Sequence, residues 1–150
     1  MIAQHILVPV DFSEDAEQAL SYALEIAGKL GARLTLVHVI QAPVATARGM
    51  GVSLTAYFQQ VELEASATMN DRARRAQEAG IACDIVILQG APFQQIVDLA
   101  SARQVDLIVM GTQGRTGLQR FVLGSVAERV VRLAPCPVLV TRSANPRPPS

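Results

Sequence analysis

The chain has 150 residues, of which 50% are hydrophobic and 17% are charged, and its 13 basic side chains balance 13 acidic ones. This length suits one domain with a single core, and the zero net charge excludes an overall field that attracts nucleic acid or anionic membranes. No apolar run reaches the ~18 residues that cross a bilayer, and the first residues lack the pattern of a secretory signal. We therefore expect one cytoplasmic domain that binds neither nucleic acid nor membrane, so any anion site must be local.

The first half of the chain alternates between strand and helix periods. Residues 6–10 form an almost continuous apolar run, as in a strand that is covered on both faces. Ser13 is placed to cap a helix with an acidic first turn, and Gly31 is placed to end it. The next elements that we expect are a strand at 34–40, a loop at 41–53 and a long helix at 54–79 that stops at Gly80.

The second half repeats this alternation. Pro92 suits the first position of a helix because its missing N–H has no partner there, whereas Pro135 and Pro137 end a later helix. The segment 143–150 has little to bury, so we expect a disordered tail after a domain that spans 1–142. The elements expected here are a strand at 81–88, a helix from 92, a strand at 105–110, a helix at 125–133 and a strand at 138–141.

The two cysteines, Cys83 and Cys136, lie far apart in the sequence and form no CxxC motif. Two reduced thiols explain this spacing better than a disulfide framework does, with a single bridge as the alternative. We interpret both cysteines as small buried residues without a redox role.

Alternating strands and helices predict an α/β fold, in which a parallel sheet carries helices on both faces. The ligand of such a sheet sits beyond the carboxyl ends of the strands, at the point where the chain reverses its direction of winding. Two turns at these ends carry unusual residues, namely 9–11 after the first strand and the glycine-rich stretch 111–124 after the fourth. If the two strands are neighbours, both turns line one crevice.

The glycine-rich stretch suggests an anion site. A loop that lacks Cβ atoms at Gly111, Gly114 and Gly124 and ends at the start of a helix can turn its N–H groups toward a phosphate. Ser125 adds a hydroxyl donor at the helix start. The alternative is that the glycines only make turns and cap helices, with Ser125 as an ordinary N-cap.

Other residues near the same crevice suit a nucleotide. Arg115 and Arg120 supply charge and can make forked contacts to phosphate. The Asp11 carboxylate can accept both hydroxyls of a ribose, or it can simply cap the following helix or turn. The apolar side chains that can flank an adenine, unless they are simple core, are Val10, Val39 and Met110.

Three stretches carry a family resemblance: HILVPVDFSEDAEQAL at 5–20, LTLVHVI at 34–40 and DLIVMGTQGRTGLQRFVLGSVAERVVRLAPCPVLV at 106–140. Along almost the whole chain, the sequence resembles the universal stress protein family. In particular, Gly111-x2-Gly114-x9-Gly124-Ser125 looks like the G-2x-G-9x-G-(S/T) signature of the ATP-binding branch of that family. Members commonly have a histidine where this chain has Gln113, so any contact made by that imidazole is not carried over.

This resemblance implies a Rossmann-like, doubly wound sheet of five strands in the order 3-2-1-4-5, with the first and fourth strands side by side. It also implies a homodimer through the fifth strand, here Val138, Leu139 and Val140, whose free edge otherwise invites uncontrolled pairing. The implied ligand contacts are Asp11 to the ribose, Val10 and Val39 to the adenine with Pro9 beside them, Met110 and Gly111 to base and sugar, and Gly114, Gly124, Ser125 and Val126 to the phosphates.

The function implied by the resemblance is an ATP-binding stress or signalling module, with ATP bound alone or with Mg²⁺. The sequence contains neither a P-loop nor a G-x-G-x-x-G motif, and no clear general base, so no catalytic or metal-binding residue is assigned. His5 and His38 lie in expected strands and are interpreted as structural. The alternatives are a slow ATPase or phosphotransfer protein that uses the same crevice, and a structural dimer that binds no nucleotide.

Overall fold

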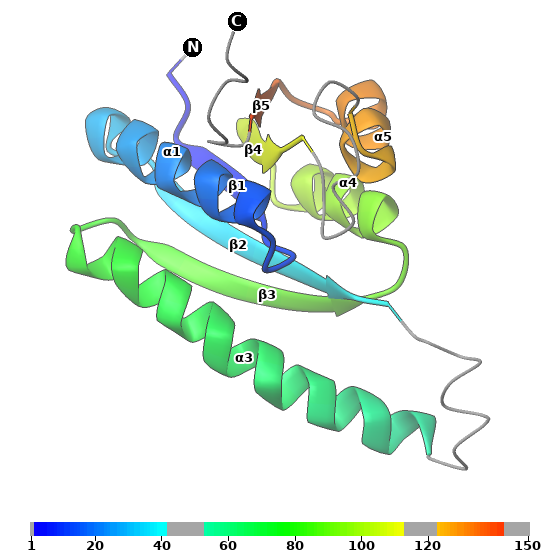
Figure 1. The fold of residues 1–150 in the computed structure, drawn as a ribbon. Helices are drawn as coiled ribbons and strands as arrows, with labels where there is room; N and C mark the ends of the chain where they lie inside the picture. The colour runs from blue at the N-terminus through cyan, green and yellow to red at the C-terminus, as the bar shows by residue number, and fades with distance from the viewer. Residues whose placement is uncertain (1, 42–52, 113–122, 143–150) are drawn as a thin grey trace, which may run out of the picture.

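Five parallel strands form the centre of the computed structural model, which describes residues 2–41, 53–112 and 123–142 (Figure 1). The strand order is β3-β2-β1-β4-β5, and every neighbouring pair is parallel. The α/β fold and the strand order are therefore confirmed, whereas most of the expected loop and the tail 143–150 lie outside the described residues. The strands are β1 (His5–Pro9), β2 (Arg33–Ile40), β3 (Cys83–Gln89), β4 (Leu107–Gly111) and β5 (Val138–Thr141).

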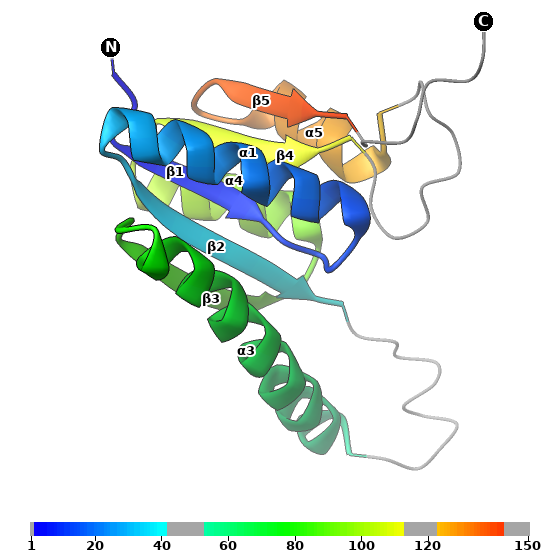
Figure 2. The same ribbon diagram turned by 60° about the vertical axis from the view of Figure 1, so that its left-hand side comes forward.

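The helices cover both faces of the sheet. Two of them, α1 and α3, pack on one face, and α4 and α5 pack on the other (Figures 1 and 2). Among the described residues, no helix combines the length and the apolar character needed to cross a bilayer. The helix bounds are α1 (Glu14–Leu30), α3 (Leu54–Glu78), α4 (Pro92–Ala102) and α5 (Ser125–Leu133).

Each strand contributes side chains to two apolar layers, because successive side chains point to opposite faces. In β1, Ile6 and Val8 lie in the layer beneath α1 and α3, whereas Leu7 lies in the layer beneath α4 and α5. All three side chains are fully buried. This two-sided burial explains why the strand sequence is continuously apolar rather than alternating.

Local signals position the start and end of α1 as expected. The Ser13 hydroxyl accepts a hydrogen bond from the backbone N–H of Ala16 at 3.1 Å, so Ser13 is the N-cap. Gly31 ends the helix at φ 69°, a left-handed conformation that glycine adopts at little cost. The chain then turns directly into β2.

Two strands begin two residues later than the sequence predicts. The N–H of Ile81 donates to the carbonyl of Ala76, and the N–H of Val105 donates to the carbonyl of Ala100, both at 2.9 Å. These bonds close the ends of α3 and α4, so both residues belong to the helix-to-strand turns despite their apolar character. Hydropathy alone does not separate a buried turn residue from the first residue of a buried strand.

A polar network joins the amino-terminal ends of β1, β2 and β3, and it runs from the buried His5 and Thr35 to the exposed Asp84 and Arg103. His5 Nε2 lies 2.7 Å from Thr35 Oγ1, which donates to Asp84 Oδ1 at 2.7 Å, and Arg103 binds the other Asp84 oxygen at 2.6 Å. Because Thr35 gives its single hydroxyl proton to Asp84, the proton between His5 and Thr35 belongs to His5 Nε2. His5 Nδ1 is then unprotonated, and it is buried without a hydrogen-bond partner in the described structure.

This environment opposes a second proton on His5. Burial, and then the Arg33 guanidinium, lower the pKa of His5 below its ordinary 6.5 despite opposing effects of the Arg103 backbone and Asp84. Burial alone raises the pKa of Asp84, but hydrogen bonds from Arg103 and Thr35 outweigh it and hold that pKa below its ordinary value. At neutral pH the network therefore contains a neutral imidazole and an ionised carboxylate.

We predict that acid destabilises the fold through His5. As the pH falls through 6.5, the unfolded chain binds a proton at His5 before the folded chain does, so the free energy of unfolding falls. Each unit of pKa displacement is about 1.4 kcal/mol, which lowers the melting temperature by roughly 3–5 °C. Thermal melts of wild type and His5→Gln between about pH 7.5 and 5.5 measure this, since Gln keeps a donor but cannot titrate; parallel losses in both proteins contradict the prediction.

Candidate functional site

The described parts of the two unusual turns, residues 9–11 and 111–112, lie at the carboxyl edge of the sheet. β1 pairs directly with β4 through Ile6 with Leu107 and Leu7 with Ile108. Beyond these strands, Thr112 Oγ1 donates to Asp15 Oδ2 at 3.0 Å, which ties the turn after β4 to the first turn of α1. The chain winds to opposite sides of the sheet from β1 and β4, so this edge is the switch point at which α/β folds bind ligands.

Asp11 lies in the turn that follows β1 and leads into α1. Its Oδ1 accepts hydrogen bonds from the backbone N–H of Ser13, at 3.0 Å, and from the Ser13 hydroxyl. Asp11 thus supports the turn, as one of the two sequence interpretations states, while Ser13 caps the helix. Both bonds use one carboxylate oxygen, so Oδ2 is not committed to them, and the ribose contact stays a prediction.

The apolar side chains expected around an adenine do not share one face of the sheet. Val10 is 2% exposed and lies in the layer beneath α1 and α3. Met110, which is 5% exposed, and the half-buried Val39 lie in the layer beneath α4 and α5. The structure therefore brings Val39 and Met110 to the same layer. The Val10 side chain lies in the other layer, and only the Val10 backbone lies at the carboxyl edge beside them. Pro9 is the last residue of β1 and is half-buried.

The start of α5 presents backbone N–H donors that have no partner among the described residues. The helical hydrogen bonds begin with the N–H of Glu128, which donates to the carbonyl of Gly124 at 2.9 Å. The N–H groups of Ser125, Val126 and Ala127 precede that bond, and no side chain of the described residues caps the helix. Because the aligned peptide dipoles also place partial positive charge here, the first turn of α5 suits an anion.

Gly124, and not Ser125, is the N-cap of α5, so the alternative that Ser125 is an ordinary N-cap is wrong. Gly124 has φ −62° and ψ 160°, which any residue adopts, and its N–H donates to the Thr112 carbonyl at 2.6 Å. The backbone conformation therefore gives no reason for glycine at this position. Ser125 is the first residue of the helix and is exposed.

Gly111, by contrast, has a structural reason to be glycine. A Cβ atom at this position meets Asp15 Cβ at 2.7 Å and the Asp15 carbonyl carbon and oxygen at 2.8 Å. The group that approaches Gly111 closely in this structure is Asp15 of α1. The expected contact of Gly111 to base and sugar stays a prediction. Gly114, Arg115 and Arg120 lie outside the described residues.

The two cysteines offer no reactive thiolate. Both are free, and they pack on opposite faces of the sheet, Cys83 beneath α1 and α3 and Cys136 beneath α4 and α5. Burial, with a smaller effect of the Asp84 charge, raises the pKa of Cys83 to about 11, and burial also raises that of Cys136. Within the described ranges, no three His, Cys, Asp or Glu side chains gather to hold a metal ion.

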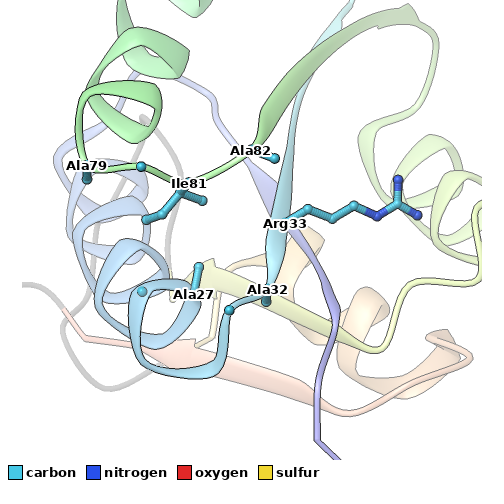
Figure 3. Close-up of a pocket in the computed structure, with 9 residues that line it drawn as sticks. Ala27, Ala32, Arg33, Ala79, Ile81 and Ala82 are labelled. Carbon is cyan, nitrogen blue, oxygen red and sulfur yellow. The ribbon is translucent and has the colours of Figure 1, made fainter.

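A small cavity lies at the opposite, amino-terminal edge of the sheet, between the ends of α1 and α3 (Figure 3). Its volume is about 270 Å³, and its lining consists mainly of alanine and glycine residues with Ile81. Arg33 is the one charged lining residue, and its side chain extends away from Ala27 and Ile81 (Figure 3). This cavity contains none of the predicted site residues and presents no chemistry beyond its small side chains and backbone.

Comparison with known proteins identifies relatives along almost the whole chain. Residues 3–142 match the model of the Universal stress protein family. Universal stress protein MJ0531 of Methanocaldococcus jannaschii is 34% identical over 137 residues, which cover 91% of this chain and 81% of that protein.

Solved structures agree with the fold. Protein MJ0577 of the same archaeon superposes with a TM-score of 0.85 at 30% identity, and the match covers 100% of both chains. The universal stress protein from Archaeoglobus fulgidus, solved in complex with dAMP, has a TM-score of 0.68 at 28% identity, and the match covers 93% of this chain and 98% of that one.

Proposed function

The chain belongs to the universal stress protein family, and we propose that it is an ATP-binding member that acts as a stress or signalling module. Adenine nucleotide binding is supported by the relative from Archaeoglobus fulgidus, which was solved with dAMP. ATP rather than a monophosphate is favoured by the Gly111-x2-Gly114-x9-Gly124-Ser125 spacing, which matches the signature of the ATP-binding branch. The nucleotide-binding domain that we propose comprises residues 1–142.

The observation that carries this proposal is the start of α5. Gly124 occupies an N-cap with an ordinary backbone conformation and no side-chain cap. At such a position Ser, Thr, Asp or Asn stabilises a helix at least as well as glycine does. We explain the glycine by a ligand that approaches this position closely. The N–H groups of the first turn of α5, which have no partner among the described residues, suit a phosphate.

The other proposed contacts are those that the resemblance to the family implies, together with Arg115. Asp11 holds the ribose hydroxyls, Val39 and Met110 lie beside the base with Pro9 and the Val10 backbone, and Gly111 passes close to the sugar. Gly114, Arg115, Gly124, Ser125 and Val126 bind the phosphates. We propose that ATP binds alone or with Mg²⁺, which commonly binds through phosphate oxygens with one or two carboxylates, and we assign no Mg²⁺ ligand of the protein.

The first test is the nucleotide that the protein carries when it is purified without heating. Denaturing the protein and separating the released bases and phosphates by anion exchange identifies ATP, ADP or AMP. A stoichiometric yield of ATP supports the proposal. Only AMP or cyclic nucleotides in the released fraction contradict the choice of ATP.

Slow ATP hydrolysis is the second candidate, because the same crevice would serve it. Hydrolysis needs a positioned water and usually a general base, and Asp11 does not supply that base because we assign it to the ribose. ATP turnover in wild type and in Gly114→Val distinguishes hydrolysis in this crevice from contamination. Turnover that the substitution leaves unchanged comes from a contaminating enzyme, and turnover that it abolishes assigns ATPase activity to this crevice.

We further propose that β5 forms the dimer interface. Among the described residues, β5 pairs only with β4, and its four residues are all half-buried. An edge that is free within the described structure and carries the apolar residues Val138, Leu139 and Val140 favours pairing with a second copy.

Leu139→Asp is expected to convert the dimer into monomers, because it places a charge in the paired edge. Size-exclusion chromatography with light scattering measures the mass of the particle. Leu63→Asp controls for the added charge alone, since Leu63 lies on α3 and is 69% exposed, and a melt of Leu139→Asp verifies its fold, since Leu139 packs against the layer beneath α1 and α3. A Leu139→Asp protein that elutes as the wild-type dimer moves the interface to another surface.

A further inference from the structure

We infer that His38 is a positioning residue of the nucleotide site, where it holds the turn that presents Asp11 to the ribose. His38 lies in β2, one residue before Val39. This inference rests on the proposed function, because it gives Asp11 the ribose contact proposed above. It concerns a side chain that the sequence alone marks only as a strand residue.

The imidazole fixes the residue on the amino-terminal side of Asp11. His38 Nδ1 lies 2.7 Å from the carbonyl oxygen of Val10. A carbonyl can only accept, so Nδ1 carries a proton and donates it. The N–H of Val10 donates in turn to the carbonyl of Val37 at 2.7 Å. Both backbone polar groups of Val10 are thus bound to β2, one residue beyond the last residue of β1.

The same imidazole supports the residue on the other side of Asp11. The Phe12 ring stacks on the His38 ring, with 4.4 Å between the centroids and 20° between the planes. Phe12 has φ 66°, a left-handed conformation that bulky residues seldom adopt. Such a conformation persists only where surrounding contacts determine it. The stack on His38 and the apolar layer beneath α1 and α3, which Phe12 joins, are those contacts.

Asp11 therefore lies between two residues that one side chain holds. The Asp11 carboxylate is oriented as well, because Oδ1 binds the N–H and hydroxyl of Ser13. His38 orients the backbone on both sides of Asp11, and Ser13 orients its carboxylate. The Asp11 Oδ2 atom therefore has little freedom to move. A carboxylate that is fixed before the ligand arrives loses less conformational entropy on binding. His38 thus contributes to ribose affinity without touching the nucleotide.

The test compares ATP with 2′,3′-dideoxy-ATP, which lacks both hydroxyls that Asp11 holds. His38→Leu removes the hydrogen bond and the stacking partner. We expect the dissociation constant for ATP to rise about tenfold, which is the lower end of what hydrogen bonds to a carboxylate supply. The dissociation constant for 2′,3′-dideoxy-ATP is expected to stay within about twofold of the wild-type value, because that ligand gains nothing from Asp11.

Two further variants keep the test independent of a folding defect. His38→Asn retains an N–H donor close to the position of Nδ1 and is expected to recover part of the ATP affinity. Phe12→Leu removes the stack but leaves the hydrogen bond to Val10, and it is expected to weaken ATP binding less than His38→Leu. His5→Gln is the control, since His5 lies at the opposite end of β1 and should leave both affinities unchanged. Circular dichroism and melting temperature verify the fold of each variant.

Four results overturn the inference. An equal loss of affinity for both ligands in His38→Leu means that His38 serves the fold in general. Wild-type affinity for ATP in that variant means that the turn does not depend on His38. A wild-type protein that binds both ligands equally well shows that Asp11 does not hold the ribose hydroxyls, yet leaves nucleotide binding intact. If wild type binds neither ligand, the proposed function fails as well.

Discussion

Gly124→Val is expected to reduce ATP affinity by at least about a hundredfold, which is the scale of several lost hydrogen bonds to phosphate, while the protein stays folded. The valine branch fills the space at the N-cap of α5 that we assign to the phosphates. It meets no conformational obstacle, because φ −62° and ψ 160° suit a β-branched residue. Valine is a poorer N-cap than glycine, so the melting temperature should fall by a few degrees at most, roughly 2–4 °C per kcal/mol. Isothermal titration with ATP and a thermal melt of the same preparation measure the two effects.

Gly28→Val is the matched control for this substitution. Gly28 lies within α1, and a Cβ there meets no atom within 4 Å. It lines the cavity at the amino-terminal edge, on the other side of the sheet from the proposed phosphates. The control should bind ATP like wild type. If Gly124→Val also binds ATP like wild type, the proposed phosphate site at α5 is wrong.

Gly111→Ala is expected to have the largest effect on stability. The added Cβ lies 2.7 Å from Asp15 Cβ and 2.8 Å from the Asp15 carbonyl, and backbone atoms cannot rotate aside. β4 must therefore separate from α1, which affects the contact that joins the two turns of the site. Overpacking of this kind costs about 1–3 kcal/mol, or roughly 2–12 °C in melting temperature.

Urea and thermal unfolding of Gly111→Ala measure this cost directly. Gly28→Ala is the comparison, because an alanine in open space within a helix stabilises by about 0.5–1 kcal/mol. The two substitutions therefore change stability in opposite directions. A Gly111→Ala protein that melts with wild type contradicts the close packing of α1 on β4.

The fold was predictable from the sequence because its signals are local. The Ser13 cap, the Gly31 terminator and the apolar strand runs fix element types and lengths. The boundaries were less accurate where an apolar residue closes a helix, as Ile81 and Val105 do. Only the hydrogen-bond partner, which hydropathy does not reveal, distinguishes these residues from strand residues.

The candidate site was predictable in its location but less so in its details. The period of two along β1, continued by one residue, places Val10 on the same side as Ile6 and Val8. The expectation that the Val10 side chain flanks the adenine together with Val39 and Met110 did not take this into account. Other details depend on contacts between distant parts of the chain, as with Gly111 against Asp15. The left-handed Phe12 also has no signature in a single sequence, since glycine, and not phenylalanine, normally marks that conformation.

Titration of the wild-type protein with ATP, after any bound nucleotide has been removed, is the decisive measurement. We expect saturable binding of one ATP per chain with a dissociation constant below about 1 mM, a free energy of at least about 4 kcal/mol. Binding should be lost in Gly124→Val and kept in Gly28→Val. A wild-type protein that shows no saturable binding at millimolar ATP contradicts the assignment of a nucleotide site to the carboxyl edge of β1 and β4.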